Sequence, residues 1–61
     1  MPHRFEAGQT VEFTPGLSDR GAKRGRYRVV RCLPPEGRDN QYRVQSVVDG
    51  HERVVRESQL A

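Results

Sequence analysis

Residues 41–56 read QYRVQSVVDGHERVVR, and this stretch decides the fold class. Polar and apolar residues alternate along its first half, which is the period of a strand with one buried face. The Asp49-Gly50 pair that follows is a strong hairpin signal, because glycine permits the positive φ of tight turns. Residues 51–56 are therefore expected to return as the partner strand. The expected inward-facing residues are Tyr42, Val44, Ser46 and Val48, and the expected outward-facing residues are Arg43 and Gln45.

Similar patterns extend the sheet toward the N-terminus. A turn at residues 8–9 (Gly-Gln) is expected to lead into a strand that places Val11 and Phe13 on one face. Residues 15–16 (Pro-Gly) end this strand, since proline lacks a ladder donor and glycine permits positive φ. The following segment, to residue 25, is expected to be a glycine-containing loop.

The next strand-like run is residues 26–33, RYRVVRCL. Tyr27 and Val29 share one face, whereas Val30 and Cys32 fall on the other. A β-bulge or burial on both faces would reconcile the two patterns. Residues 34–40 (PPEGRDN) are predicted to be a connection, because two prolines and a glycine interrupt a ladder.

A final short segment completes the expected core. Residues 57–60 (ESQL) are read as a single tight turn that lets Leu60 cap the core. No window has a sustained period of 3.6 residues, so no helix longer than a turn is expected. The 61 residues therefore predict one all-β domain over residues 1–61, either a small barrel or an open sheet rolled on itself.

Composition favours a small β domain in a reducing compartment. Valine supplies eight of the hydrophobic residues, and its branched side chain suits a pleated surface. The single cysteine, Cys32, cannot form an internal disulfide, which predicts a cytoplasmic protein. Its neighbours Val30 and Leu33 favour core packing over a reactive thiol. No apolar run approaches the roughly 20 residues that span a membrane, and residues 1–4 lack a signal-peptide core, so no membrane partner is expected.

Several short motifs recur in a recognisable order. They are Phe5 with GQTVEF (8–13), GRY (25–27) with VV (29–30) and LP (33–34), QYRV (41–44) with Ser46, and HERVVRE (51–57) with Leu60. Together they resemble a family of short uncharacterised alphaproteobacterial proteins that adopt SH3-like barrels. The resemblance covers nearly the whole chain and implies an all-β, small SH3-like barrel of about five short strands with a terminal 3-10 turn. That family has no assigned activity, so the resemblance implies no functional residue.

A looser likeness connects the glycine-led first strand and the small-barrel layout to the plasmid-type dihydrofolate reductases. That family lines a tetramer pore with a Val-Gln-Ile-Tyr run. The corresponding stretch here is residues 53–56, RVVR, so the pore chemistry is missing and this enzyme assignment is rejected.

The positive charge is concentrated in residues 19–28, DRGAKRGRYR. This stretch has five basic residues and one acidic residue, a net charge of +4, whereas the other six basic and seven acidic residues give −1. Clustered cations attract phosphates without base-specific geometry, and Gly21 and Gly25 would let backbone amides approach a phosphate closely. The candidate residues for binding nucleic acid or another anionic partner are Arg20, Lys23, Arg24, Arg26 and Arg28.

Two observations favour a merely solvated loop instead. Exposed charge runs are commonly solvated, and a GC-rich genome would by itself enrich arginine, which makes up ten of the 11 basic residues. Nucleic-acid platforms also expose several aromatic rings for stacking, and this chain has four aromatic residues. Phe5, Phe13 and Tyr42 have core parity and Tyr27 alternates with Val29, so at most one ring is expected at the surface.

Residues 51–57 (HERVVRE) are a second candidate cluster, for acid–base chemistry or metal binding. In a strand His51 points away from Glu52, and metal sites need three or four convergent ligands. A cross-strand ionic ladder of Arg43 with Glu52 or Arg53 is the expected role. No catalytic, metal or cofactor constellation can be assembled from the sequence, so neither an enzyme nor a cofactor is expected.

The function expected from the sequence is that of a small non-catalytic binding module. Weak, sequence-nonspecific nucleic-acid binding through residues 19–28 is the leading hypothesis. One alternative is a protein–protein adaptor that contacts an acidic peptide or pairs a partner strand with a sheet edge. The other is a homo-oligomeric structural protein; the sequence does not specify the oligomeric state.

Overall fold

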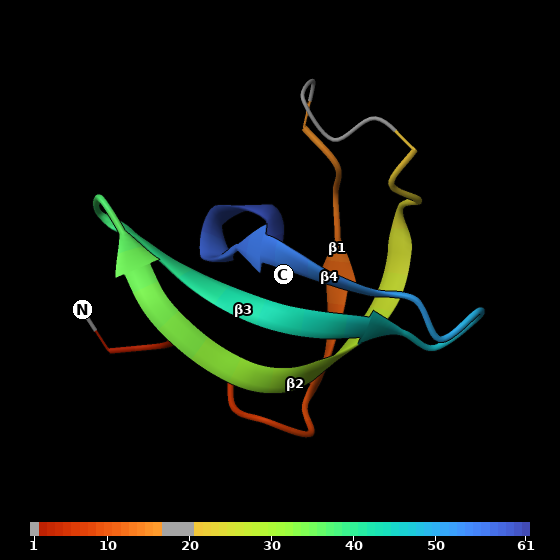
Figure 1. Cartoon of the computed structure of the whole chain (residues 1–61), viewed down its shortest axis with the longest axis horizontal. Helices are drawn as coiled ribbons and strands as arrows, with labels where there is room; N and C mark the ends of the chain where they lie inside the picture. The colour runs from red at the N-terminus through yellow and green to blue at the C-terminus, as the bar shows by residue number, and fades with distance from the viewer. Residues whose placement is uncertain (1, 17–20) are drawn as a thin grey trace.

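A computed structural model describes residues 2–16 and 21–61 of the chain. The described residues form one open antiparallel sheet with the strand order β1-β2-β3-β4 (Figure 1). The strands are β1 (Thr10–Phe13), β2 (Gly25–Glu36), β3 (Asp39–Ser46) and β4 (Glu52–Arg56), and the 3-10 turn η1 (Glu57–Gln59) follows. The all-β prediction is confirmed, with four strands in the described part of the chain, where no helix has the length and apolar character to cross a bilayer.

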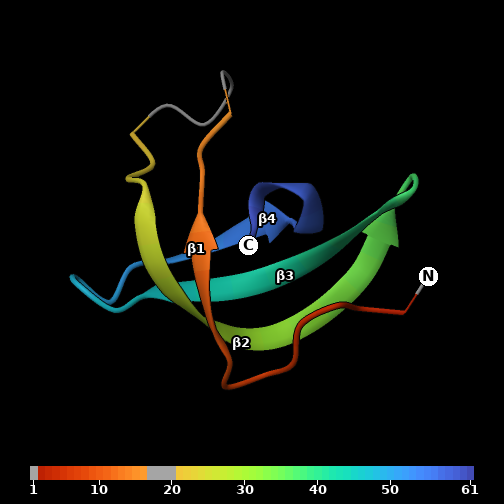
Figure 2. The same cartoon turned by 180° about the vertical axis from the view of Figure 1, so that it is seen from behind.

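The bulge predicted in β2 is confirmed at Val30. β2 and β3 form a long curved pair, seen from both sides in Figures 1 and 2. Val29 faces Val44 and Arg31 faces Arg43, so the register shifts by one residue between the two pairs. Val30 is 39% exposed, because the bulge directs it outward and returns the following residues to the sheet's regular alternation.

The prediction that residues 34–40 form a connection is wrong. β2 continues through Pro34 and Pro35 to Glu36, which pairs with Asp39. The register shifts between Leu33 and Glu36, so the prolines lie where ladder pairing is interrupted and their missing N–H groups remove no bond. The actual turn is the two residues 37–38, Gly-Arg.

Gly37→Ala is expected to destabilise the fold because Gly37 has a φ of +65°. A Cβ at this φ costs about 1–2 kcal/mol. Arg38→Ala changes the neighbouring turn residue, whose φ is not positive, and is the matched control. Urea unfolding followed by circular dichroism measures both, and equal losses for the two variants would contradict this explanation of the turn.

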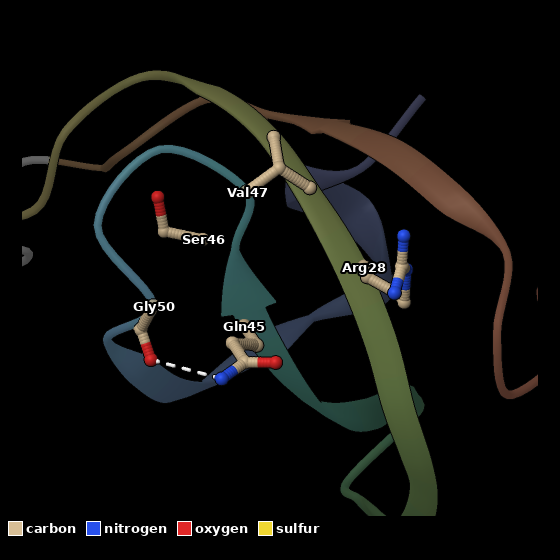
Figure 3. A pocket seen from close by; sticks show the side chains of 5 residues that line it. All are labelled: Arg28, Gln45, Ser46, Val47 and Gly50. Carbon is tan, nitrogen blue, oxygen red and sulfur yellow. Dashed lines mark hydrogen bonds between the residues drawn. The ribbon is translucent and has the colours of Figure 1, made fainter.

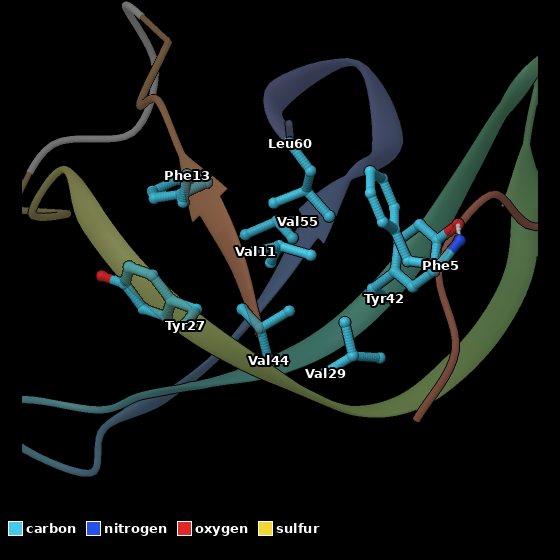
Figure 4. Close-up of a cluster of buried hydrophobic side chains, with 9 residues drawn as sticks. All are labelled: Phe5, Val11, Phe13, Tyr27, Val29, Tyr42, Val44, Val55 and Leu60. Atoms are coloured by element: carbon cyan, nitrogen blue, oxygen red, sulfur yellow. Dashed lines mark hydrogen bonds between the residues drawn. The ribbon is translucent and has the colours of Figure 1, made fainter. Parts of the chain in front are cut away.

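The core is a single cluster of nine buried side chains on the concave side of the sheet (Figure 4). Two edge-to-face pairs organise it, Phe13 with Tyr27 and Phe5 with Tyr42, at ring-centroid distances of 5.3 and 5.8 Å. All four aromatic residues of the chain are buried, which agrees with the expectation that at most one ring lies at the surface. The members are Phe5, Val11, Phe13, Tyr27, Val29, Tyr42, Val44, Val55 and Leu60.

Two of the expected core residues lie outside this cluster. Val48 is 88% exposed, because β3 ends at Ser46 and the chain turns away before the alternation reaches it. Cys32 is exposed although it pairs with Tyr42, and its Sγ donates a hydrogen bond to the carbonyl of Phe5 at 3.4 Å instead of packing in the core. The predictions of an inward Val48 and a core Cys32 are wrong.

η1 turns the chain so that residues 59–61 run beside β1. Backbone hydrogen bonds of 3.0 Å run both ways between Glu12 and Ala61, and Thr14 N donates to Gln59 O at 2.9 Å. Leu60 forms a bridge with Phe13 and is 6% exposed, which confirms that it caps the core. β1 is thus hydrogen-bonded on one side to β2 and on the other to this C-terminal segment.

The N-terminal segment is fixed to the other end of the core by a polar network. Glu57 Oε2 accepts hydrogen bonds from Arg4 N at 2.8 Å, Asn40 Nδ2 at 3.3 Å and the Tyr42 hydroxyl. Burial first, and then the hydrogen bond to Glu57, raise the pKa of Tyr42 to about 12. The Tyr42 hydroxyl, followed by Arg4 N, lowers the pKa of Glu57. The network therefore holds a proton on Tyr42 and a negative charge on Glu57.

Candidate anion-binding surface

The structure describes four of the five cations predicted to bind an anionic partner. Lys23 and Arg24 lie in the segment before β2, and Arg26 and Arg28 occupy outward-facing positions of β2. All four are exposed, because the alternation of β2 buries Tyr27 and Val29 instead. The fifth, Arg20, lies outside the described residues.

These four cations differ in their ion pairing. Arg26 lies opposite Glu12 on β1, and its Nε is 3.3 Å from Glu12 Oε1. Within residues 2–16 and 21–61, Lys23, Arg24 and Arg28 have no ion pair within 4.0 Å. Three of the predicted cations are therefore not neutralised by an ion pair within the part of the chain that the structure describes.

The loop between β3 and β4, residues 47–51, lies at the same end of the sheet as these cations. Val47 N donates to Arg26 O at 3.3 Å. His51 N donates to Asp49 Oδ1 at 3.0 Å, and this bond is the main cause of a lowered Asp49 pKa. The Asp49-Gly50 hairpin is confirmed, although the connection is five residues long rather than a two-residue turn.

A hollow of about 290 Å³ separates Arg28 from this loop (Figure 3). Gln45 forms part of its wall and is held in place, since Gln45 Nε2 donates to Gly50 O at 3.1 Å. The guanidinium of Arg28 is the cationic group of the hollow, and it can donate two parallel hydrogen bonds to a phosphate. The lining residues are Arg28, Gln45, Ser46, Val47 and Gly50.

Arg31 belongs to the same outward face and was missed in the sequence. It lies directly opposite Arg43, and like charges in this position destabilise a sheet. Arg43 Nη1 is 3.5 Å from Glu52 Oε1, so the predicted ladder with Glu52 is confirmed, whereas Arg31 has no ion pair among the described residues. The bulge at Val30 was the feature that could have identified Arg31, because it returns Arg31 to the face of Arg28.

Arg53 was also missed, because residues 51–57 were interpreted as a surface ladder. It pairs with Val44 and shares the inward parity of Val55, so it enters the concave side of the sheet beyond the core. Its Nε is buried and has no hydrogen-bond partner among the described residues. The available signal was an arginine at an apolar position of the β4 alternation.

Two other kinds of binding site are absent from the described residues, an aromatic stacking platform and a metal site. All four aromatic rings are buried, so none forms a stacking platform. No three histidine, cysteine, aspartate or glutamate side chains in the described segments are grouped to hold a metal ion. No protein-family model, curated protein or solved structure matches the chain.

Proposed function

We propose that this chain is a small non-catalytic binding module that holds nucleic acid weakly through its phosphates. The observation that carries the proposal is a group of exposed cations around the loop between β3 and β4 that have no ion pair among the described residues: Lys23, Arg24 and Arg28. Arg31 extends this group along the outward face of β2. Phosphate contacts need no base-specific geometry, which suits side chains on a convex, ring-free surface.

The fold proposed for this module is an SH3-like barrel in which residues 59–61 act as a short fifth strand. The hydrogen bonds between Glu12 and Ala61, and the 3-10 turn that precedes them, support this assignment. A reducing compartment such as the cytoplasm is the proposed location, and the single, exposed Cys32 supports it.

Binding through three or four cations has a characteristic salt dependence. The logarithm of the binding constant is expected to fall with the logarithm of salt concentration with a slope of roughly −2 to −4. Without aromatic stacking, affinity is expected to vary little with base sequence.

Arg28→Glu is expected to lower affinity for a fluorescein-labelled oligonucleotide by at least about tenfold at low salt, because it reverses a charge that no ion pair of the described residues neutralises. Arg38→Glu makes the same charge change in the turn at the opposite end of β2 and is the control. Fluorescence anisotropy measures both. Equal losses would show that net charge alone governs binding and would contradict a site at Arg28.

A protein partner is the second candidate, and the edge of β4 supports it. β4 pairs with β3 on one side alone in the described sheet, so residues 52–56 could accept a partner strand. Strand addition would resist salt and tolerate Arg28→Glu. A second copy of the chain at this edge would raise the mass measured by light scattering with increasing concentration.

A further inference from the structure

A second, smaller hollow lies near the loop between β3 and β4 and is separate from the hollow at Arg28. Its volume is about 160 Å³, which is below the roughly 300–1,000 Å³ of pockets that enclose a whole small ligand. It is therefore large enough for the end of a ligand rather than for a nucleotide. The lining residues are Gly21, Lys23, Tyr27, Asp49, His51 and Arg53.

Arg53 is the group in this hollow whose charge is least compensated. Within residues 2–16 and 21–61, its buried Nε has no hydrogen-bond partner and no acidic side chain lies within 4.0 Å of its guanidinium. A partly desolvated cation without a partner is unfavourable, and an anion that bonds to it offsets that cost.

The other charged groups of the hollow set the charge of the expected ligand. Lys23 is held at the rim because its backbone carbonyl accepts a hydrogen bond from the Tyr27 hydroxyl, at 2.8 Å. Asp49 is already engaged by His51, through the backbone N–H at 3.0 Å and the ring Nδ1 at 3.9 Å. The hollow thus has an excess of one positive charge when His51 is neutral, because Lys23 and Arg53 outnumber Asp49.

We propose that this hollow binds the carboxylate end of a ligand, with Nε and one Nη of Arg53 donating to its two oxygens and Lys23 adding a second cation. A planar monoanion matches both the fork of the guanidinium and the single excess charge. Lys23 is shared with the proposed nucleic-acid surface, but Arg53 is not, so the carboxylate site does not depend on nucleic-acid binding. The carboxylate can belong to a free small acid or to the C-terminus of a peptide.

The test uses the Nε–H resonance of Arg53 in a nitrogen–proton correlation spectrum of the intact chain. Because this group is buried, its proton exchanges slowly enough to observe. Sodium acetate is titrated against sodium chloride at equal ionic strength. Saturable movement of the Arg53 resonance with acetate, without a matching movement with chloride, is the expected result; no movement, or equal movement with both salts, overturns the proposal.

Two variants locate the effect on the proposed residues. Arg53→Met is expected to weaken acetate binding, followed by backbone amide shifts, by at least about tenfold, and Lys23→Met by a smaller factor. Arg56→Met is the control, because Arg56 is on the same strand but its Nε lies 3.9 Å from Asp39. Should Arg53→Met fail to fold, Lys23→Met and the wild-type titration still decide; acetate binding that Lys23→Met and Arg56→Met weaken equally overturns the proposal.

Further titrations distinguish the sources of the carboxylate. A short peptide with a free C-terminus is compared with the same peptide carrying a C-terminal amide. Tighter binding of the free-carboxylate peptide than of acetate supports the site and assigns it to peptide ends. Binding of acetate alone supports the site and assigns it to small acids. Binding of inorganic phosphate without acetate overturns the carboxylate assignment.

Discussion

Leu60→Ala is expected to lower the free energy of unfolding by about 2–5 kcal/mol, the usual cost of truncating a buried leucine. Domains carry roughly 0.05–0.15 kcal/mol of stability per residue, so about 3–9 kcal/mol is available to this chain of 61 residues. The Leu60 side chain therefore accounts for a large share of the free energy of unfolding. Leu60 is 6% exposed, and it bridges to Phe13 where the C-terminal segment meets β1.

Chemical unfolding followed by far-ultraviolet circular dichroism measures this loss. Val48→Ala is the matched control, because Val48 is 88% exposed and its truncation should change stability by less than about 0.5 kcal/mol. If Leu60→Ala and Val48→Ala lose equal stability, the burial of Leu60 against β1 does not stabilise the fold.

The polar network of Tyr42 and Glu57 predicts that stability falls at both ends of the pH scale. The folded pKa of Tyr42 is about 12 and its unfolded value is 10.0, so the folded chain binds this proton more tightly. Its contribution is complete below pH 10 and is lost as pH rises toward 12. Since one pKa unit corresponds to about 1.4 kcal/mol, this alkaline loss is roughly 2–3 kcal/mol.

Glu57 acts in the opposite direction. Its folded pKa lies below its ordinary value of 4.5, because the Tyr42 hydroxyl and Arg4 N hydrogen-bond to the carboxylate. Its contribution is present above that ordinary value and is lost as pH falls through the folded pKa. We therefore expect a plateau of stability at intermediate pH.

Two variants separate these contributions in unfolding curves measured across pH. Tyr42→Phe removes the titrating hydroxyl and should flatten the alkaline decline, although it is less stable throughout because Arg4 N and Phe5 N lose an acceptor. Glu57→Gln should flatten the acid decline. An alkaline decline of unchanged size in Tyr42→Phe would show that another group causes it.

Alternation in the sequence was sufficient to predict the faces of β1 and most of β3, since the extra residues of the irregular β2–β3 pairing lie on β2 and leave the alternation of β1 and β3 unbroken. Val11, Phe13, Tyr42 and Val44 are all buried as the pattern predicts. The end of β2 could not be predicted, because proline is excluded only from positions that supply a ladder bond. The register shift after Leu33 is a property of pairing with β3 and is invisible in a local pattern.

The sequence predicted where the candidate surface lies more accurately than which residues form it. The excess of charge in residues 19–28 correctly marked exposed cations, but it could not show that Glu12 pairs with Arg26, since that contact arises from the register of β1 and β2. The outward position of Arg31 could be predicted only once the bulge at Val30 was placed. The inward position of Arg53 could be predicted only from the continuation of the β4 alternation past the core into a hollow.

The pairing of β1 with residues 59–61 also has a kinetic consequence. Glu12 and Ala61 are joined by hydrogen bonds but lie 49 residues apart in a chain of 61. Joining distant segments costs loop-closure entropy before the contact stabilises anything, whereas the β2–β3 and β3–β4 hairpins close locally. We therefore expect the hairpins to form first and the contact between Leu60 and Phe13 to limit the folding rate.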